Sequence, residues 1–390
     1  MKKSLFAIAA VTAFAGAAQA QSSVTVYGIL DVGYVGSNSK ATVNNTKSSE
    51  TRSFIGQSAE SSSRLGFKGT EDLGGGTSAF FTFETGLSPN DSTLSGFNNR
   101  QAFVGLAKKG LGNAAVGTQY TTIHQAVAVT SANQQNNIVG DVIYPQNTGI
   151  TNTDGSASNA GAGYTVRTSN TIQFQSEKFA GFEGKAFYAL NNKDNNQASG
   201  TTTTVTGGNT NSNGYGLGVN YGWQKLLVTA NYQSFKQETN AGTPPAAAFT
   251  ISGTGTLTAT NVQDNQTYAA ATYDFGILKA YAQYINRKVE STLNSSNYAK
   301  RSAQQIGVRS YITPTVEAWA SIGNGRIQAF GVNNPTANFN AYQLGANYYL
   351  SKRTNLYGIF GGSNTSTVAT TAGTNSANGN NYAVGVRHTF

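Results

Sequence analysis

The sequence of 390 residues contains no cysteine, only 6 prolines and few charged residues, which make up 11% of the chain. Without cysteine, disulfides, thiol catalysis and cysteine-ligated zinc are excluded. After the first twenty residues, no apolar run approaches the roughly 20 residues that a transmembrane helix needs. A helical membrane protein is therefore excluded, and a large core or the closure of a sheet has to stabilise the chain.

The first twenty residues have the pattern of a secretory signal peptide. Lys2 and Lys3 precede a short apolar segment, and Ala18-Gln19-Ala20 matches the small residues of a cleavage site. We expect a signal peptide at residues 1–20 and one exported domain at residues 21–390. The exported domain would carry 24 basic and 17 acidic residues, a net charge of +7, which favours an anionic partner such as a lipid headgroup, a nucleic acid or a small solute.

Glycine and aromatic residues are abundant, with 45 Gly, 20 Tyr and 20 Phe. Many of them fall in segments in which apolar and polar residues alternate with the period of two that is typical of a β-strand. In VTVYGILDVGY, residues 24–34, valines and Leu30 share one face and Asp31 lies on the other. In the last segment, NYAVGVRHTF, Tyr382 and Val384 share a face and Arg387 lies opposite. Each such segment predicts a strand with one apolar and one polar side.

Short turns alternate with long polar connections. Long connections rich in Asn, Ser, Thr and Gly follow Leu190 and Phe360, for example. Seven short turns and eight long loops would join sixteen strands, which puts both termini at the same end. The short turns are EDLGGG (71–76), KKGLG (108–112), KFAGF (178–182), GWQK (222–225), DFGI (274–277), ITPT (312–315) and SKRT (351–354).

This alternation indicates a membrane barrel. Polar tracts also link soluble domains, but such linkers do not alternate strictly with tight turns. Bacterial outer-membrane barrels have short periplasmic turns, long extracellular loops and strands of about ten residues. Residues 21–390 provide about 23 residues for each strand with its share of connections, which suits this architecture. We therefore predict an all-β fold, a 16-stranded antiparallel transmembrane β-barrel.

Several segments also resemble the general diffusion porins of Gram-negative bacteria, specifically the beta-proteobacterial type. They are SSVTVYGILDVGY near the start, SRLGFKGTEDLGGG (63–76), NRQAFVGL (99–106), VRTSNTIQFQS (166–176) and VGVRHTF at the end. The resemblance implies an outer-membrane homotrimer that lets small hydrophilic solutes and ions diffuse passively, in contact with outer-membrane lipids and lipopolysaccharide. It also implies that loop 3, residues 121–166, folds into the lumen, and that Phe390 belongs to the signal read by the barrel assembly machinery.

The family has a basic cluster opposite loop 3. The matching positions here are Arg64, Lys68, Arg100 and Arg167. Alternation supports this reading, since Leu65, Phe103 and Ile172 facing outward would turn the arginines inward. Asp141 and Asp154 are the nearest carboxylates of loop 3, and Thr118 stands where the family commonly has an arginine. Other lumen-facing candidates are Lys185, Arg309 and Arg387. A ring of cations predicts a weak preference for anions.

The sequence bears on two other functions, an enzyme and a substrate-specific channel. An enzyme is disfavoured, since His124 and His388 are the only histidines and no hydrolase, metalloprotease or P-loop motif occurs. We expect no cofactor, metal or nucleic-acid partner. A substrate-specific outer-membrane channel stays open as an alternative, because an aromatic row, Tyr281, Tyr311, Trp319 and Tyr349, would line the lumen if these side chains point inward.

Overall fold

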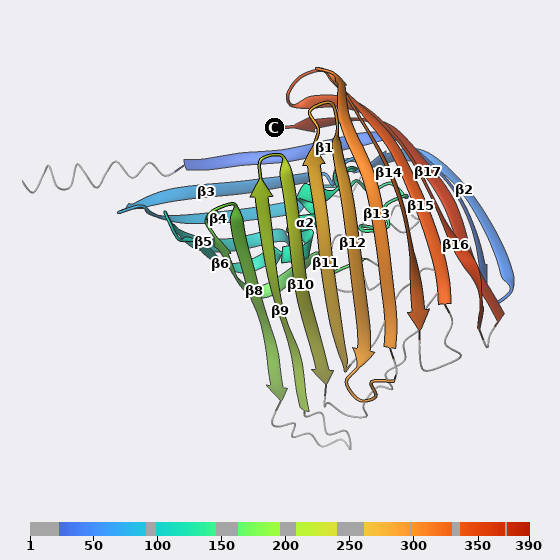
Figure 1. Ribbon diagram of the computed structural model, residues 1–390, viewed down its shortest axis with the longest axis horizontal. Coiled ribbons are helices and arrows are strands. Elements are labelled where there is room, and N and C mark those ends of the chain that lie inside the picture. The colour runs from blue at the N-terminus through green and yellow to red at the C-terminus, as the bar shows by residue number, and fades with distance from the viewer. Residues whose placement is uncertain are drawn as a thin grey trace, which may run out of the picture.

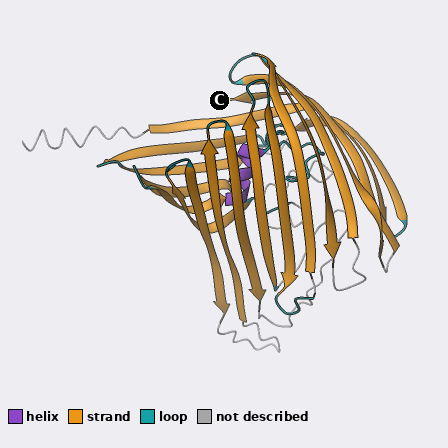
Figure 2. Ribbon diagram, in the orientation of Figure 1, coloured by secondary structure: helices purple, strands orange, loops and turns teal. Residues whose placement is uncertain are grey.

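The computed structural model describes residues 23–90, 99–145, 163–195, 208–239, 261–296, 298–329, 336–370 and 373–390. The strands form a single antiparallel sheet that closes on itself (Figure 1). One helix occurs in these segments, α2 (Thr122–Thr130), and it lies inside the barrel (Figure 2). No described helix is long and apolar enough to cross a membrane. The predicted signal peptide lies outside the described residues.

The sheet consists of seventeen strand segments. They are β1 (Ser23–Val43), β2 (Thr46–Gln57), β3 (Arg64–Gly74), β4 (Thr77–Gly86), β5 (Asn99–Lys108), β6 (Gly112–Tyr120), β7 (Arg167–Ser176), β8 (Phe182–Asn195), β9 (Gly208–Trp223), β10 (Leu226–Thr239), β11 (Val262–Asp274), β12 (Lys279–Ser291), β13 (Tyr298–Thr313), β14 (Val316–Ala329), β15 (Thr336–Tyr349), β16 (Thr354–Thr370) and β17 (Gly373–Thr389).

Seventeen segments make sixteen barrel strands, as predicted, because β2 and β3 are two parts of one strand. Both pair with β1, and residues 58–63 interrupt the strand between them. The barrel closes where β17 pairs with β1. Beyond that register, the backbones of Gly28 and Phe390 exchange two hydrogen bonds, of 3.0 and 3.1 Å. The end of the chain is therefore part of the seam, and no strand edge is left unpaired there.

The alternation of apolar and polar residues gives the barrel two different surfaces. On β1, Val24 and Val26 are exposed on the outside, whereas Asp31 faces inward and is buried. On β17, Val384 is exposed and its register partner on β1, Tyr34, lies on the same outer face. In a membrane barrel this outer face contacts hydrocarbon, so its exposed apolar side chains are expected.

All seven short turns lie where the sequence predicts them. For example, β3 ends at Gly74 and β4 begins at Thr77, so the turn consists of Gly75 and Gly76. Both glycines have positive φ angles, 59° and 73°. Glycine adopts this conformation without steric cost, which explains the GGG sequence at this turn.

The predicted count of eight long loops is too high. Only Asn44 and Asn45 separate β1 from β2, and both have positive φ, as in a tight hairpin turn. Most of the polar stretch after Phe360 is also strand, because β16 continues to Thr370 and β17 begins at Gly373. These strand extensions carry Ser, Thr and Asn on both faces, so they lack the apolar alternation by which a strand is recognised.

Many glycines lie beneath an aromatic ring of the neighbouring strand. A Cβ atom at Gly36 would collide with the ring of Tyr382, and one at Gly345 with the indole of Trp319. The register supports this, since Gly36 pairs with Tyr382 and Gly345 with Trp319. The abundance of both residue types thus reflects ring-on-glycine packing along the sheet.

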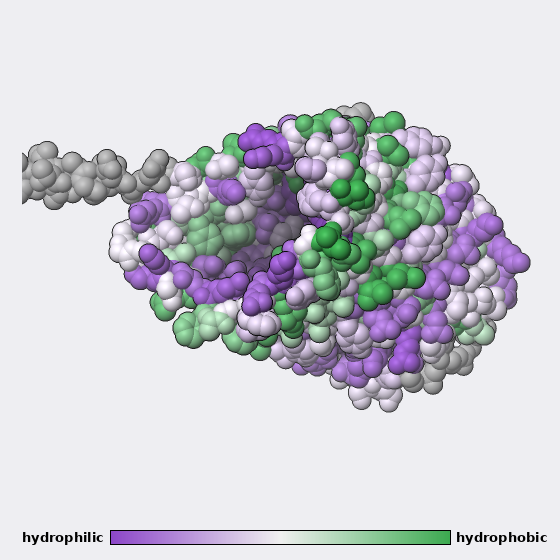
Figure 3. All heavy atoms as spheres, turned by 45° about the horizontal axis from the view of Figure 1, so that its top comes forward, coloured by the Kyte–Doolittle hydropathy of each residue, from purple (hydrophilic) through white to green (hydrophobic). Residues whose placement is uncertain are grey.

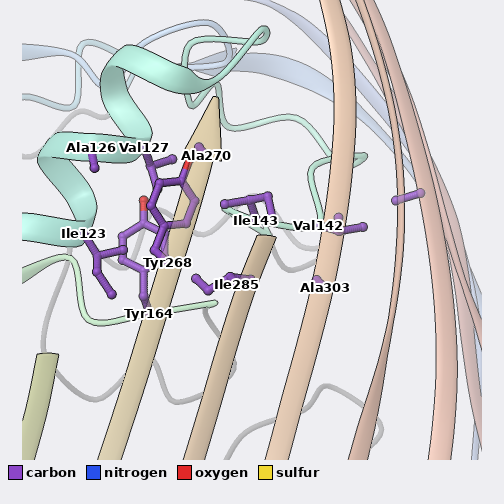
Figure 4. Close-up of a cluster of buried hydrophobic side chains, with 11 residues drawn as sticks. Ile123, Ala126, Val127, Val142, Ile143, Tyr164, Tyr268, Ala270, Ile285 and Ala303 are labelled. Atoms are coloured by element: carbon purple, nitrogen blue, oxygen red, sulfur yellow. The ribbon is translucent and has the colours of Figure 1, made fainter. Parts of the chain in front are cut away.

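The apolar core lies inside the barrel, between loop 3 and the wall. Ile123 and Val127 of α2 pack with Tyr164 from the end of loop 3 and with Tyr268 of β11 and Ile285 of β12 (Figure 4). A sixteen-stranded barrel is too wide for its own side chains to fill. Loop 3 therefore supplies the missing partners and becomes a fixed part of the interior.

Candidate functional site

Loop 3 is anchored at its base by Thr121. The Thr121 hydroxyl caps α2 by accepting from the His124 amide at 3.3 Å, and it donates to the Thr165 carbonyl at 2.7 Å. The Thr121 amide also bonds to the Val166 carbonyl at 3.0 Å. The two ends of the loop are thus joined, and α2 lies against β8, β9, β10, β11 and β12.

Beyond the helix, loop 3 crosses to the wall formed by β15 and β16. Asn136 and Gln343 exchange two side-chain hydrogen bonds, of 2.6 and 3.0 Å. A Cβ atom at Gly361 would collide with the Val139 carbonyl oxygen, so the loop approaches this strand as closely as glycine permits. The described part of loop 3 therefore lies against the inner wall from α2 at β8–β12 to its tip at β15 and β16.

Three arginines come together at the starts of β3, β5 and β7, and we call Arg64, Arg100 and Arg167 the arginine cluster. The Arg100 Nε lies 2.8 Å from a Glu84 carboxylate oxygen, and an Arg64 nitrogen lies 3.7 Å from the same atom. Arg100 also donates to the Tyr120 hydroxyl at 3.0 Å. The Arg167 guanidinium stands 5.7 Å from the centre of the Tyr120 ring. Glu84 and Tyr120 thus connect the three guanidinium groups.

Lys68 extends the arginine cluster toward the short turns. Its ammonium group lies 5.5 Å from the centre of the Tyr27 ring, and the Tyr27 hydroxyl donates to Glu84 at 3.2 Å. The Lys68 side chain is exposed. The ammonium group therefore remains available to solutes in the lumen.

A β-bulge corrects the facing predicted for Phe103. The pairing of β4 with β5 shifts by one residue between Glu84 and Thr85, which reverses the alternation near Arg100. After the bulge along β5, Val104 is exposed on the outside, while Phe103 faces inward. The centres of the Phe103 and Phe80 rings lie 6.3 Å apart. The prediction of an outward Phe103 is wrong, and Arg100 faces the lumen because of the bulge.

Aromatic rings of loop 3 and β6 surround the arginine cluster. The His124 ring lies 4.4 Å from the Tyr120 ring, and Tyr144 and Tyr164 lie 5.9 Å from His124. Burial lowers the pKa of His124 well below its usual value, and the guanidinium groups of the arginine cluster lower it further. His124 is therefore neutral at neutral pH, and the positive charge of this region comes from the arginines.

The carboxylate of Asp141 is turned into loop 3. It accepts from the backbone amides of Ile143 and Tyr144, at 2.7 and 2.9 Å, and from the Asn133 side chain at 2.8 Å. The residue is buried. Asp141 thus stabilises the loop backbone, while Asp154, the other predicted carboxylate, lies outside the described residues.

The remaining predicted lumen residues face inward and make ion pairs. Lys185 lies 3.1 Å from Glu183 and donates to Gln125 of α2. Arg309 lies 3.4 Å from Glu317, and Arg387 lies 3.5 Å from Glu60. The aromatic row also faces inward: Tyr281 and Trp319 are buried, Tyr349 donates to Glu317, and Tyr311 pairs with Glu317 in register.

Sequence reasoning missed two parts of this site. Glu84, which joins Arg64 to Arg100, lies in the alternating strand TSAFFTFETG, where a single inward carboxylate looks like any polar residue. Residues 58–63, SAESSS, leave the sheet and enter the lumen. Their only signal is a run of small polar residues in which the period of two is lost.

The lumen opens at the end that carries the short turns. Figure 3 shows this end hollowed, with hydrophilic side chains along the opening. No group of residues suited to hold a metal ion occurs among the described residues. The site is therefore a polar passage lined by arginines with aromatic rings beside them.

Comparison with known proteins gives consistent relatives. The family model described as Gram-negative porin matches residues 7–368. Outer membrane porin protein 32 of Delftia acidovorans is 28% identical over 92% of this chain and 88% of its own. The major outer membrane protein P.IB of Neisseria meningitidis serogroup B is 27% identical over the full length of both chains.

Solved structures share the fold. An anion-selective porin from Comamonas acidovorans superposes with a TM-score of 0.66 at 23% identity, covering 95% of this chain and all of that one. The trimer form of OmpT from Vibrio cholerae superposes with a TM-score of 0.58 at 14% identity, covering 95% and 99% of the two chains. With a family match over nearly its whole length and a closed barrel around a polar lumen, the chain belongs to the Gram-negative porin family and is a diffusion channel of the outer membrane.

Proposed function

We propose that the lumen is a passive, water-filled channel for small hydrophilic solutes and ions with a weak preference for anions. The observation that carries this proposal is the arginine cluster, whose three guanidinium groups converge around Glu84 and Tyr120. Fixed cations in a low-dielectric wall raise the local concentration of anions and repel cations.

The charge balance supports the same direction. In the group formed by Glu84 and the arginine cluster, three guanidinium groups accompany one carboxylate. On the described part of loop 3, residues 121–145 and 163–166, the one carboxylate is Asp141, and its contacts come from the loop itself. This part of the loop thus presents rings and amides, and not carboxylates, to the arginines.

The comparisons add support for two further proposals. A solved structure of the same fold is described as an anion-selective porin, and another was obtained as a trimer. We propose that this chain also assembles as a homotrimer. Its outer face contacts outer-membrane lipids and lipopolysaccharide. Phe390, whose backbone pairs with that of Gly28 at the seam, belongs to the signal that the barrel assembly machinery reads.

We propose transport without catalysis. His124, the one histidine in the lumen among the described residues, is held neutral and contacts Tyr164 and Gln135. A serine-based hydrolase needs a hydroxyl nucleophile and an orienting carboxylate next to such a base. Among the described residues, the His124 ring contacts the phenol of Tyr164 and the amide of Gln135, which are neither a serine hydroxyl nor a carboxylate.

Reversal potentials of the purified protein in planar bilayers test the anion preference. With a salt gradient across the bilayer, anion selectivity fixes the sign of the zero-current potential. A potential of the opposite sign at neutral pH would overturn the proposal and leave the fold intact.

A substrate-specific channel is the second candidate, favoured by the inward-facing row of Tyr281, Tyr311, Trp319 and Tyr349. Liposome swelling distinguishes the two. A general porin sorts solutes of one size by charge alone, whereas a specific channel saturates with its preferred solute.

A further inference from the structure

Residues 58–63, which we call the inner segment, leave the barrel wall and turn into the lumen. The turn begins at Ser58, whose φ is +62°. Because the inner segment no longer pairs in the sheet, its backbone groups need other partners. Three of its backbone amides, those of Ser58, Glu60 and Ser61, find them on a single residue, Asp31 of β1.

The Asp31 carboxylate binds the middle of the inner segment. Its Oδ2 atom accepts from the backbone amides of Glu60 and Ser61, at 2.8 and 2.6 Å. Its Oδ1 atom accepts from the Tyr357 hydroxyl at 2.6 Å. Asp31 is fully buried. A buried carboxylate that receives three hydrogen bonds is a strong and directional anchor.

The Asp31 backbone binds both ends of the inner segment. Its carbonyl accepts from the Ser58 amide at 2.8 Å, and its amide donates to the Ser63 hydroxyl at 3.0 Å. The two ends and the middle of the inner segment are thus tied to one residue. A change confined to the Asp31 side chain would release the middle and leave the ends in place.

The inner segment in turn holds the tip of loop 3. The Asn137 amide donates to the Ala59 carbonyl at 2.9 Å, and the Asn137 side chain donates to the Ser58 carbonyl at 2.6 Å. Ala59 and Ile138 belong to the same buried apolar cluster as Val35. The tip of loop 3 and the inner segment therefore pack as one unit against the wall.

The inner segment also fixes Arg64 of the arginine cluster. The Arg64 Nε donates to the Ser62 carbonyl at 3.0 Å, and its NH2 group donates to the Ser61 hydroxyl at 3.1 Å. The Ser61 amide is one of the two that Asp31 binds. The position of this guanidinium therefore depends on the conformation that Asp31 imposes on the inner segment.

We propose that Asp31 is a positioning residue for charge selectivity: through the inner segment it fixes both Arg64 and the tip of loop 3. This inference rests on the proposed anion preference. Asp31 does not touch the solute, and it acts by keeping one cation of the arginine cluster in place.

Two substitutions of Asp31 separate positioning from charge. Asp31→Asn removes the charge but preserves the contacts, since its oxygen at the Oδ2 position still accepts from both amides and its NH2 group donates to the Tyr357 oxygen. Asp31→Ala removes both charge and contacts. Asp72→Ala is the matched control, because Asp72 also accepts a backbone amide, from Gly74, but lies exposed near the end of β3.

The primary measurement is the ratio of anion to cation permeability in planar bilayers. Asp31→Ala is expected to lower this ratio to the value of Arg64→Gln, while Asp31→Asn and Asp72→Ala keep the wild-type ratio. If Asp31 acted only by its negative charge, both Asp31 variants would raise the ratio equally. That result would overturn the inference.

A thiol reporter tests the inner segment without reference to selectivity. The chain has no cysteine, so A59C introduces a single, buried thiol. A membrane-impermeant maleimide is expected to label A59C only in the Asp31→Ala background. Absence of labelling there would refute the inference, even if the wild-type channel showed no anion preference and the proposed function failed.

A milder variant covers the case in which Asp31→Ala does not assemble. Ser61→Ala removes only the hydroxyl that accepts from Arg64. It is expected to lower the permeability ratio part of the way toward that of Arg64→Gln. An unchanged ratio in this variant would mean that the inner segment does not position Arg64.

Discussion

Neutralising the arginine cluster should abolish the anion preference of the channel. The triple variant Arg64→Gln, Arg100→Gln and Arg167→Gln removes three positive charges and leaves the carboxylate of Glu84 behind. Glutamine retains a donor for Tyr120 and Glu84, so the change in size and hydrogen bonding is small. The local charge turns from positive to negative, and the preference should shift toward cations.

The size of this shift follows from Coulomb's law. For an ion about 10 Å from each charge, the interaction in water is about 0.4 kcal/mol per charge. At about 0.1 M salt, the Debye length of about 10 Å reduces it to roughly 0.15 kcal/mol. Three charges that act on anions and cations in opposite directions change the difference by about 0.9 kcal/mol, or about fivefold in the permeability ratio.

The assay is the reversal potential of single or few channels at two salt concentrations. In molar salt the Debye length is about 3 Å, so the variant and the wild type should differ by only about 1.2-fold. The salt dependence separates an electrostatic effect from a change in pore size, since a wider or narrower pore would alter the conductance at both concentrations.

The matched control removes three positive charges outside the lumen. Lys109, Lys225 and Lys352 lie exposed in short turns. Replacing all three by glutamine gives the same net charge as the arginine variant. Equal shifts in both triple variants would mean that the channel responds to total charge, and the role assigned to the arginine cluster would be refuted.

Three further predictions concern assembly, pH and packing. Deleting Phe390 removes the backbone pairing that ends the seam, so the outer-membrane yield should fall while the conductance of the assembled channels stays unchanged; normal yield with altered conductance would contradict this. Burial and the arginines lower the pKa of His124 in the folded protein. Below about pH 6.5 the unfolded chain therefore binds the proton first, and acid reduces the stability of the fold. The fall in Tm from pH 7 to pH 5 should be smaller in His124→Gln than in the wild type. An equal loss in both proteins would refute that role. Gly345→Ala forces a methyl group into the Trp319 ring and should lower the free energy of unfolding in urea by about 1–3 kcal/mol. Gly358→Ala is the control and should lower it less, because a methyl group there meets open space.

The sequence predicts the barrel well because the membrane imposes its pattern. Lipid on one side and water on the other require alternation, and Val24 and Asp31 on β1 follow it. Outside the membrane this constraint ends. The extensions of β16 and β17 are polar on both faces. They pair with each other, and β17 pairs with β1, without an apolar face, so alternation could not distinguish them from loops.

The site is only partly predictable for a related reason. Family resemblance predicts Arg64, Arg100 and Arg167, but the inward direction of Arg100 depends on a bulge that shifts the register next to Glu84. A bulge inserts one residue into a pattern of period two and leaves little trace in composition. Glu84 and the inner segment act through contacts between distant strands, which local sequence patterns do not encode.

The interior of the barrel couples stability to selectivity. A barrel of this width needs inserted backbone to fill it, and inserted backbone needs polar partners because it has left the sheet. Loop 3 and the inner segment meet this need with carboxylates, Asp141 and Asp31, that bind backbone amides. Those carboxylates are thereby withdrawn from the channel surface. The arginines on the wall are left with less opposing charge, so the contacts that hold the inserted segments in place also favour an anion-selective lumen.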